Sequence, residues 1–373
     1  MSQVATFLSE HKWETAAALA TAATALVLLR RATSATKRKS VATPADTKPR
    51  RTSTDYYASS FTLATIPSLV GRVAIVTGGN TGLGYHSVKH LAFNGAKVFL
   101  AARSKDRAET AIANLKAEAA AAGKIIDVEF VRVDLGDLKQ TKDAAIALAK
   151  RVNRIDILVN NAGIMDVVTK EPFKLSKDGY EAMFSTNHLG HFMFTKHLLP
   201  VILKTPNTPR IVNLSSSATW MAPVYGIDYE TLKKHNPAFS AGNYYGQSKL
   251  ANLLFSTELH NKYGYQIAVN SVHPGVVDTE LIRPDRFSLA WFFFSLIPKR
   301  WILSLIIGPI LTPEQGAHAQ LYAATHPEID SKNIRGKFII PYGVVSDDHH
   351  PKGMDKDLAK QLWDFSEQVC AKY

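Results

Sequence analysis

The stretch Val73-Ala-Ile-Val-Thr77-Gly78-Gly-Asn-Thr-Gly82-Leu-Gly84 decides the fold of this chain. Val73–Thr77 is a short apolar run typical of a buried strand, and a helix-like stretch over residues 86–94 follows the glycines. Glycines let the backbone turn tightly from strand to helix and approach a ligand closely. The N–H groups of the helix N-terminus can then bind a pyrophosphate. The stretch predicts a strand, a phosphate-binding loop and a helix, with ordinary turn glycines as the alternative.

Further strand-like runs follow this stretch at the spacing of a parallel sheet. They lie at residues 97–101, 128–133, 155–160, 210–213 and 267–272, and helical stretches such as 106–122 and 138–153 separate them. Alternation of strand and helix at this spacing favours crossover connections. The sequence therefore predicts an α/β fold with a Rossmann-type, doubly wound parallel sheet in a single domain over residues 61–373.

The net charge of +12 belongs largely to a short leader. Residues 30–51 hold eight lysines and arginines against Asp46 alone, and so carry +7. Because the excess charge sits outside the folded body, no nucleic-acid partner is expected. The one cysteine, Cys370, cannot form an intramolecular disulfide, which fits a reducing compartment, and we expect it to be a bystander in a C-terminal helix.

The N-terminal leader contains an uncharged, alanine-rich run over residues 15–29, directly followed by basic residues. We interpret residues 1–31 as a candidate membrane anchor helix and residues 32–60 as a basic flexible linker. The anchor would place the protein on a membrane, the endoplasmic reticulum or a lipid droplet being favoured, with the catalytic domain facing the cytosol. A cleaved mitochondrial presequence and a frayed surface helix are the alternatives, because a spanning helix needs about 20 apolar residues.

The end of the second strand bears on the choice of cofactor. A dinucleotide without the 2′-phosphate favours an acidic side chain about 20 residues past the glycines. This chain instead has Ala101-Ala102-Arg103-Ser104-Lys105, which contains no carboxylate. An arginine can bind a 2′-phosphate with two parallel hydrogen bonds. The sequence favours NADP(H), and a surface arginine without a ligand is the alternative for Arg103.

The motif Tyr245-Gly-Gln-Ser-Lys249 can make the tyrosine hydroxyl act as an acid or a base. A free tyrosine has a pKa near ~10, and a lysine four residues later lies one helical turn away on the same face. A nearby ammonium group favours the phenolate, so that we expect Lys249 to lower the pKa of Tyr245. Alone, the motif is also compatible with a Tyr/Lys pair on a solvated helix face.

With these residues in view, the chain resembles the short-chain dehydrogenase/reductase family, and within it the retinol-dehydrogenase-like branch. The resemblance covers roughly residues 69–373. It rests on seven motifs in the family's order, namely Thr77-Gly-Gly-Asn-Thr-Gly-Leu-Gly84, Asp134-Leu135, Asn160-Asn-Ala-Gly163, Asn187, Ser215-Ser216, Tyr245-x3-Lys249 and Pro274-Gly-Val-Val-Asp-Thr279. Each motif alone is a weak indication of the family, but seven of them in the family's order and register would very rarely occur by chance.

The resemblance implies roles for individual side chains. Tyr245 would exchange a proton with the substrate oxygen, Lys249 would lower its pKa and hold the nicotinamide ribose, and Ser216 would position the substrate oxygen. Asn187 would hold a water that links Lys249 to solvent. The candidate cofactor-binding residues are Gly78, Asn80, Thr81, Gly82, Leu83, Gly84, Arg103, Asp134, Leu135, Asn161, Ala162, Gly163, Tyr245, Lys249, Pro274, Gly275, Val277 and Thr279.

Two of these assignments choose between neighbours. Tyr245 is preferred to Tyr244 because only Tyr245 lies four residues before Lys249. Adjacent serines on a strand point to opposite faces, and alignment with the serine at the family's strand end favours Ser216 over Ser215.

A second apolar stretch spans residues 287–311 and is interrupted by Lys299-Arg300 and two prolines. We interpret it as an apolar lid that accepts a lipophilic substrate and dips into a membrane surface, with two ordinary core helices as the alternative. His188, His191 and His197 lack a zinc-ligand spacing, and no metal is expected.

Taken together, these features predict an NADP(H)-dependent oxidoreductase that interconverts a carbonyl and an alcohol on a lipophilic substrate, such as a retinoid, steroid, long-chain aldehyde or polyketide-like ketone. A non-catalytic nucleotide-sensing scaffold is one alternative, opposed by the presence of all four candidate catalytic residues. NAD-linked oxidation of a small alcohol is another, opposed by Ala102-Arg103. Assembly into a homo-oligomer is left open.

Overall fold

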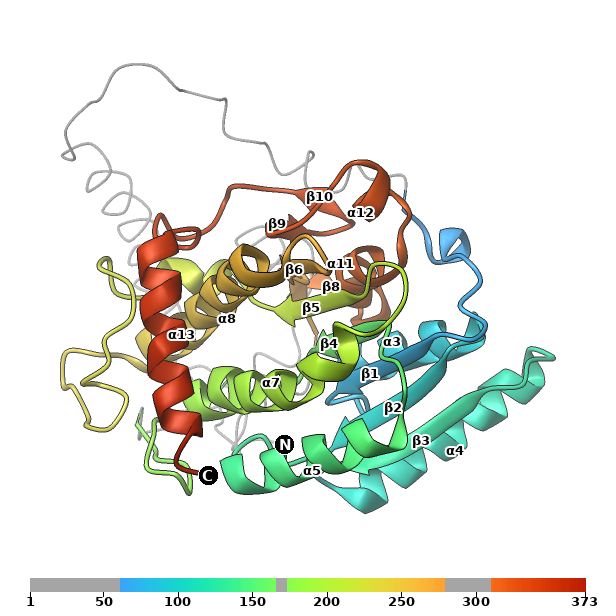
Figure 1. Cartoon of the computed structure of the whole chain (residues 1–373), viewed down its shortest axis with the longest axis horizontal. Coiled ribbons are helices and arrows are strands. Elements are labelled where there is room, and N and C mark those ends of the chain that lie inside the picture. Colours follow the sequence, from blue (N-terminus) through green and yellow to red (C-terminus); the bar gives the residue numbers. More distant parts are fainter. Residues whose placement is uncertain (1–60, 166–172, 279–309) are drawn as a thin grey trace, which may run out of the picture. The chain divides into compact units, whose positions relative to one another are not determined.

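A computed structural model describes residues 61–165, 173–278 and 310–373 of the protein, and its centre is an eight-stranded sheet (Figure 1). The strand order is β10-β9-β6-β5-β4-β1-β2-β3. These strands are β1 (Val73–Thr77), β2 (Lys97–Ala102), β3 (Asp127–Arg132), β4 (Ile157–Asn160), β5 (Arg210–Leu214), β6 (Ala268–Val272), β9 (Lys337–Ile340) and β10 (Val344–Val345). Neighbouring strands are parallel except for the antiparallel pair β9 and β10. The predicted Rossmann-type sheet is confirmed.

Alternating side chains of the strands divide the apolar interior into two cores. Ile75 belongs to the core on one face, whereas Ala74 and Val76 belong to the core on the other. Because β1 lies in the middle of the sheet and is covered on both faces, nearly all of its residues are apolar.

Helices cover both faces of the sheet. α3 (Gly82–Phe93), α4 (Lys105–Ala121) and α11 (Pro313–Thr325) contribute to one core, and α5 (Leu138–Arg151), α7 (Gly190–Ile202) and α8 (Ala241–Tyr263) contribute to the other. α13 (Lys356–Cys370) packs on α8 and buries Cys370 (Figure 1). The shorter elements are η2 (Leu63–Thr65), α6 (Ala182–Phe184), η3 (Ser185–Leu189), η4 (Ser217–Met221), α12 (Glu328–Ser331) and the separate pair β7 (Val276–Val277) and β8 (Ile310–Leu311).

The order of the strands positions the functional edge of the sheet. The chain runs outward from β1 through β2 to β3, then returns to the other side of β1 with β4 and continues outward. Ligands of doubly wound sheets bind where this direction reverses, outside the carboxyl ends of the strands. In this protein that point lies between the ends of β1 and β4, next to Gly78 and Asn161.

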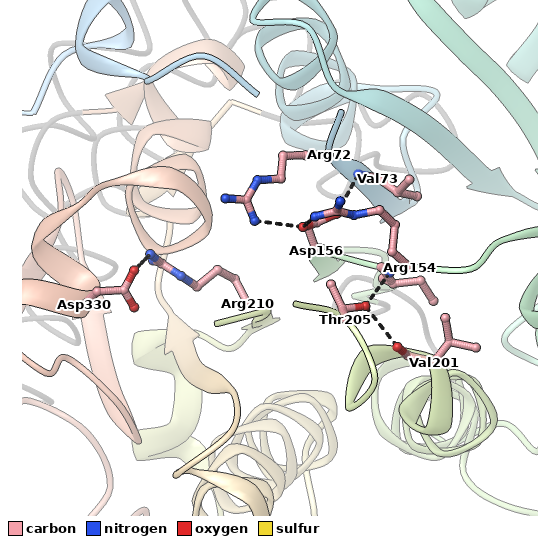
Figure 2. A network of polar contacts seen from close by, with 9 residues as sticks. Arg72, Val73, Arg154, Asp156, Val201, Thr205, Arg210 and Asp330 are labelled. Carbon is pink, nitrogen blue, oxygen red and sulfur yellow. Dashed lines mark hydrogen bonds and ion pairs between the residues drawn. The ribbon is translucent and has the colours of Figure 1, made fainter. Parts of the chain in front are cut away.

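The amino-terminal edge of the sheet is held by charged side chains (Figure 2). Asp156, just before β4, accepts hydrogen bonds from Arg72 Nη1 at 2.8 Å, Arg154 Nε at 2.8 Å and the Val73 backbone N–H at 2.9 Å. Arg210, the first residue of β5, pairs with Asp330 at 2.6 Å. This network lies at the opposite end of β1 and β4 from the glycine loop, so it braces the sheet and leaves the carboxyl edge free.

No helix within the described residues is long and apolar enough to cross a membrane. The candidate anchor over residues 1–31, the linker over residues 32–60 and most of the candidate lid, residues 287–309, lie outside the described residues.

Candidate active site

The glycine loop between β1 and α3 has the shape of a phosphate cradle. Gly82 begins α3 and has a φ of +55°, a left-handed conformation that favours glycine. At Gly84 a Cβ atom would lie 2.2 Å from the Gly78 carbonyl oxygen. Any larger residue at this position would therefore push the loop away from the helix. The cleft above the loop is lined by Gly78, Asn80, Thr81, Gly82, Leu83 and Gly84.

The far end of this cleft is basic. Arg103 is exposed and lines the cleft just after β2, beside the buried Ala101 and Ala102. Arg107 lines it as well, one turn into α4, and Ser104 caps that helix by accepting from the Arg107 N–H. Arg107 was not among the residues predicted from the sequence, and because Arg103 precedes the N-cap of α4, helical spacing does not relate the two arginines.

The loop after β4 forms the wall that faces the glycine loop. Thr77 Oγ1 accepts from the backbone N–H groups of Asn161 and Ala162 at 2.9 and 3.0 Å. The Asn161 side chain donates back to the Thr77 carbonyl at 2.8 Å. These bonds fix Asn161, Ala162 and Gly163 along the cleft, which Asp134 and Leu135 also line.

Asn187 lies in η3, a π-helical turn between α6 and α7. π-Helical turns are rare and occur frequently at functional sites. The Asn187 side chain accepts from the Ile164 N–H at 2.8 Å and donates to the Ile164 carbonyl and to Ser248 Oγ, each at 3.0 Å. Asn187 therefore joins the loop after β4 to the helix that carries Tyr245 and Lys249.

Ser216, Tyr245 and Lys249 meet at the inner end of a second cleft lined in part by all three. The hydroxyl of Ser216 shares a hydrogen bond with that of Tyr245. Ser215 is fully buried instead, and its hydroxyl donates to the Lys249 carbonyl at 2.7 Å. Tyr244 is likewise buried away from the cleft, and its hydroxyl accepts from the Asn236 N–H. The geometry thus distinguishes each preferred residue from its neighbour.

The prediction that Lys249 lowers the Tyr245 pKa is wrong for this structure. Burial raises the pKa of Tyr245 to about 12, and the hydrogen bond with Ser216 only partly offsets it. The Lys249 ammonium lies over the face of the Tyr245 ring, 5.7 Å from its centroid, and donates to the Leu214 carbonyl at 3.1 Å. Burial also lowers the pKa of Lys249 to about 8. The prediction considered only the charge of the lysine, whereas the packing around both groups has the larger effect.

The two clefts adjoin, since Leu83, Asn161, Gly163, Ile164 and Leu214 line both. Pro274, Gly275 and Val277, predicted to bind the cofactor, line the second cleft, whereas Thr279 lies outside the described residues. Sequence analysis missed several further lining residues of the second cleft, among them Met165, Met221 and the buried His273. His273 directly precedes the predicted Pro274 motif and Met165 follows Gly163 by two residues, so adjacency to these motifs could have indicated both. Met221 lies in η4 and has no such signal.

Comparison with known proteins identifies the family. A family model described as short chain dehydrogenase matches residues 72–287, more than half of the chain. The chain belongs to the short-chain dehydrogenase/reductase family. Within this family it falls in the retinol-dehydrogenase-like branch, because mouse retinol dehydrogenase 13 is 36% identical over 309 residues, covering 82% of this chain and 85% of the mouse protein.

Two further relatives agree with this family assignment. The short-chain dehydrogenase/reductase drtF of Aspergillus calidoustus is 35% identical, covering 82% of this chain and 96% of that protein. A crystal structure of an uncharacterized protein from Mycobacterium paratuberculosis is 30% identical with a TM-score of 0.60, covering 84% of this chain and 98% of that one. The protein is thus an oxidoreductase of a family that uses nicotinamide cofactors.

Proposed function

We propose that this short-chain dehydrogenase/reductase uses NADP(H) to interconvert a carbonyl and an alcohol on a lipophilic substrate. The observation that carries the proposal is the meeting of Ser216, Tyr245 and Lys249 in a cleft continuous with the glycine cradle. The residues fit a dinucleotide, because the loop leaves no room for a Cβ at Gly84 and the adjoining wall is held by backbone hydrogen bonds.

The charge of the cleft supports NADP(H) over NAD(H). Arg103 and Arg107 both line its far end, and the lining residues between Ala101 and Arg107 include no carboxylate. Guanidinium groups bind phosphate more strongly than they bind neutral ribose hydroxyls. An acidic residue at the end of β2 would have repelled the same phosphate.

A nicotinamide cofactor would supply the hydride when bound, and the residues of the chain would handle the proton. Because the Tyr245 pKa is about 12, its hydroxyl is protonated at neutral pH and can donate to a carbonyl oxygen during reduction. Ser216 is placed to donate to the same oxygen and to orient it. Lys249, with a pKa of about 8, is still largely protonated at neutral pH and offers a positive charge beside the phenolate that forms.

The lining of the second cleft supports a lipophilic substrate. Leu83, Ile164, Met165, Met221 and Val277 all line it, and Ile164 and Met221 are exposed at its mouth. Apolar side chains with a few convergent polar groups are typical of sites for apolar ligands. The relatedness to a retinol dehydrogenase points in the same direction. We also propose that residues 1–31 attach the protein to a membrane.

Replacement of Tyr245 by phenylalanine tests the proposed chemistry. The purified variant should reduce a lipophilic aldehyde or ketone with a kcat/KM about 10³-fold below that of the wild type, because the proton donor is lost. NADPH affinity, measured by titration of cofactor fluorescence, should be nearly unchanged. Tyr244→Phe is the matched control, since Tyr244 is the adjacent tyrosine and lies outside the cleft. Full turnover by Tyr245→Phe would refute the assignment.

A further inference from the structure

Three potential metal ligands meet between α3 and α11, outside the clefts described above. His86 and His90 lie one turn apart on α3, and Glu314 lies in the first turn of α11. The Glu314 carboxylate is 2.8 Å from His90 Nε2 and 3.6 Å from His86 Nδ1. No other three histidine, cysteine or acidic side chains among the described residues bring their ligand atoms within 4.8 Å of one another.

The two helices hold these side chains in place. Gly316 of α11 packs against Leu83 of α3, and the Gln320 amide donates to Ser87 Oγ across the same interface. His86 and His90 are largely buried, with side-chain exposures of 24% and 14%. Little rearrangement is therefore needed to bring the three ligands around one ion.

One atom of the cluster lacks a partner. His86 Nδ1 is buried without a hydrogen bond, and its 3.6 Å separation from Glu314 is too long for one. A buried nitrogen without a partner costs free energy. In a tetrahedral zinc site, neighbouring ligand atoms lie roughly 3.3 Å apart, which falls within the separations found in this cluster.

The chemical types of the three side chains suit a zinc ion. Lys89, which lies between the two histidines in sequence, is a positive charge near the cluster. Lys89 itself pairs with Glu118 at 2.7 Å. His318, one turn after Glu314 on α11, also interacts with His90 and Glu314. The cluster offers two imidazole nitrogens and one carboxylate oxygen, a ligand set that suits Zn²⁺ and not Mg²⁺.

We propose that His86, His90 and Glu314 bind a Zn²⁺ ion that joins α3 to α11, with water in the fourth position. The site is structural, because it does not line the cleft where Tyr245 lies. Its effect is to connect two elements that flank that cleft. α3 begins in the glycine loop. α11 begins two residues after β8, and β8 pairs with β7, the strand that contains the cleft residue Val277. Zinc should therefore stabilise the fold without taking part in the reaction.

Zinc binding by the untagged full-length protein tests this proposal. The protein is treated with a chelator, and Zn²⁺ is then titrated in competition with a chromophoric chelator. We expect one zinc ion per chain and a Tm several degrees higher at saturating zinc. Added Mg²⁺ should leave the Tm unchanged. His86→Ala and His90→Ala should each weaken binding at least tenfold.

Two further variants separate a metal site from a simple hydrogen bond. Glu314→Gln can still accept a hydrogen bond from His90 but is a poor zinc ligand, so it should also lose zinc affinity at least tenfold. His235→Ala removes an exposed histidine far from the cluster in sequence and should bind zinc like the wild type. Equal zinc affinity in the wild type and all three cluster variants would overturn the proposal, as would the absence of stoichiometric binding.

Discussion

At the scale of the residue, Arg103 and Arg107 both line the far end of the first cleft, just after β2. Replacing Arg103 by aspartate reverses one of these charges where a 2′-phosphate would bind. We predict that the ratio of kcat/KM with NADPH to that with NADH falls about 100-fold, since a charged hydrogen bond is lost and a repulsion is added. Steady-state kinetics with the two cofactors measure this ratio.

Lys105→Ala provides the matched control for that prediction. Lys105 carries the same charge two residues later, but it does not line the cleft and pairs with Glu109 at 3.6 Å. Its replacement should leave the cofactor ratio unchanged. A ratio that does not fall in Arg103→Asp, or that falls equally in Lys105→Ala, would contradict a phosphate site at Arg103.

Sequence could predict which residues of the site meet, but not their pKa values. The one-turn spacing of Tyr245 and Lys249 indicated their proximity, and alignment with the serine at the family's strand end favoured Ser216 over Ser215. The pKa of Tyr245, however, depends on how deeply the surrounding chain buries its hydroxyl. That burial depends on the tertiary packing around the second cleft, which a helical spacing does not encode.

At the scale of the element, Asp156 connects the starts of β1 and β4. Its side chain is only 3% exposed and lies between Arg72 and Arg154. We predict that Asp156→Asn lowers the free energy of unfolding by about 3 kcal/mol at pH 7, because a buried ion pair loses one partner. Urea titration followed by circular dichroism measures this change, and Asp143→Asn is the control with a smaller expected effect, because Asp143 and its partner Lys139 are 60% and 71% exposed.

The same carboxylate gives the prediction a pH dependence. Burial alone would raise the Asp156 pKa, but hydrogen bonds from Arg154, Val73 and Arg72 lower it below the ordinary value of 3.8. A lowered pKa contributes stability above the ordinary value and loses it as pH falls through the folded-state pKa. The difference between wild type and Asp156→Asn should therefore be constant near pH 7 and shrink below about pH 4. A difference independent of pH down to acid unfolding would show that packing, not charge, is responsible.

The elements differ in how well their sequence patterns predicted them. Strands β1 to β6 lie within two residues of their predicted bounds. Most are short apolar runs, whereas the edge strand β3 mixes apolar and charged residues. α3 begins four residues before the predicted 86–94, since Gly82 and Gly84 form its first turn. β9 and the two-residue strands β7, β8 and β10 were missed. Runs of two residues carry no periodicity of their own, and only their partner strands define them. β9 is as long as the predicted β4 and mostly apolar, so length does not explain why it was missed.

At the scale of the whole molecule, the proposed anchor and the catalytic domain should be separable. We predict that the full chain expressed in cells sediments with membranes, whereas a chain beginning at residue 56 stays in the supernatant and keeps its kcat/KM for a water-soluble aldehyde. The physical reason is that residues 15–29 supply the uncharged run and residues 30–51 the basic flank. Equal sedimentation of both chains would contradict attachment through residues 1–31.

Three apolar side chains that precede β1 determine how far the amino terminus can be truncated without unfolding the catalytic domain. Phe61, Ile66 and Leu69 are 4%, 6% and 6% exposed, and the Phe61 ring packs edge-on against Tyr322 of α11. A chain beginning at Gly71 lacks all three and should lose about 5 kcal/mol or more, since each buried side chain of this size contributes about 2 kcal/mol or more. Such a loss approaches the whole stability of a typical domain. Thermal unfolding should therefore give the chain beginning at residue 56 the Tm of the full-length protein, and the chain beginning at Gly71 no cooperative transition. An unchanged Tm in the shorter chain would place the amino-terminal boundary of the domain at β1 instead of residue 61.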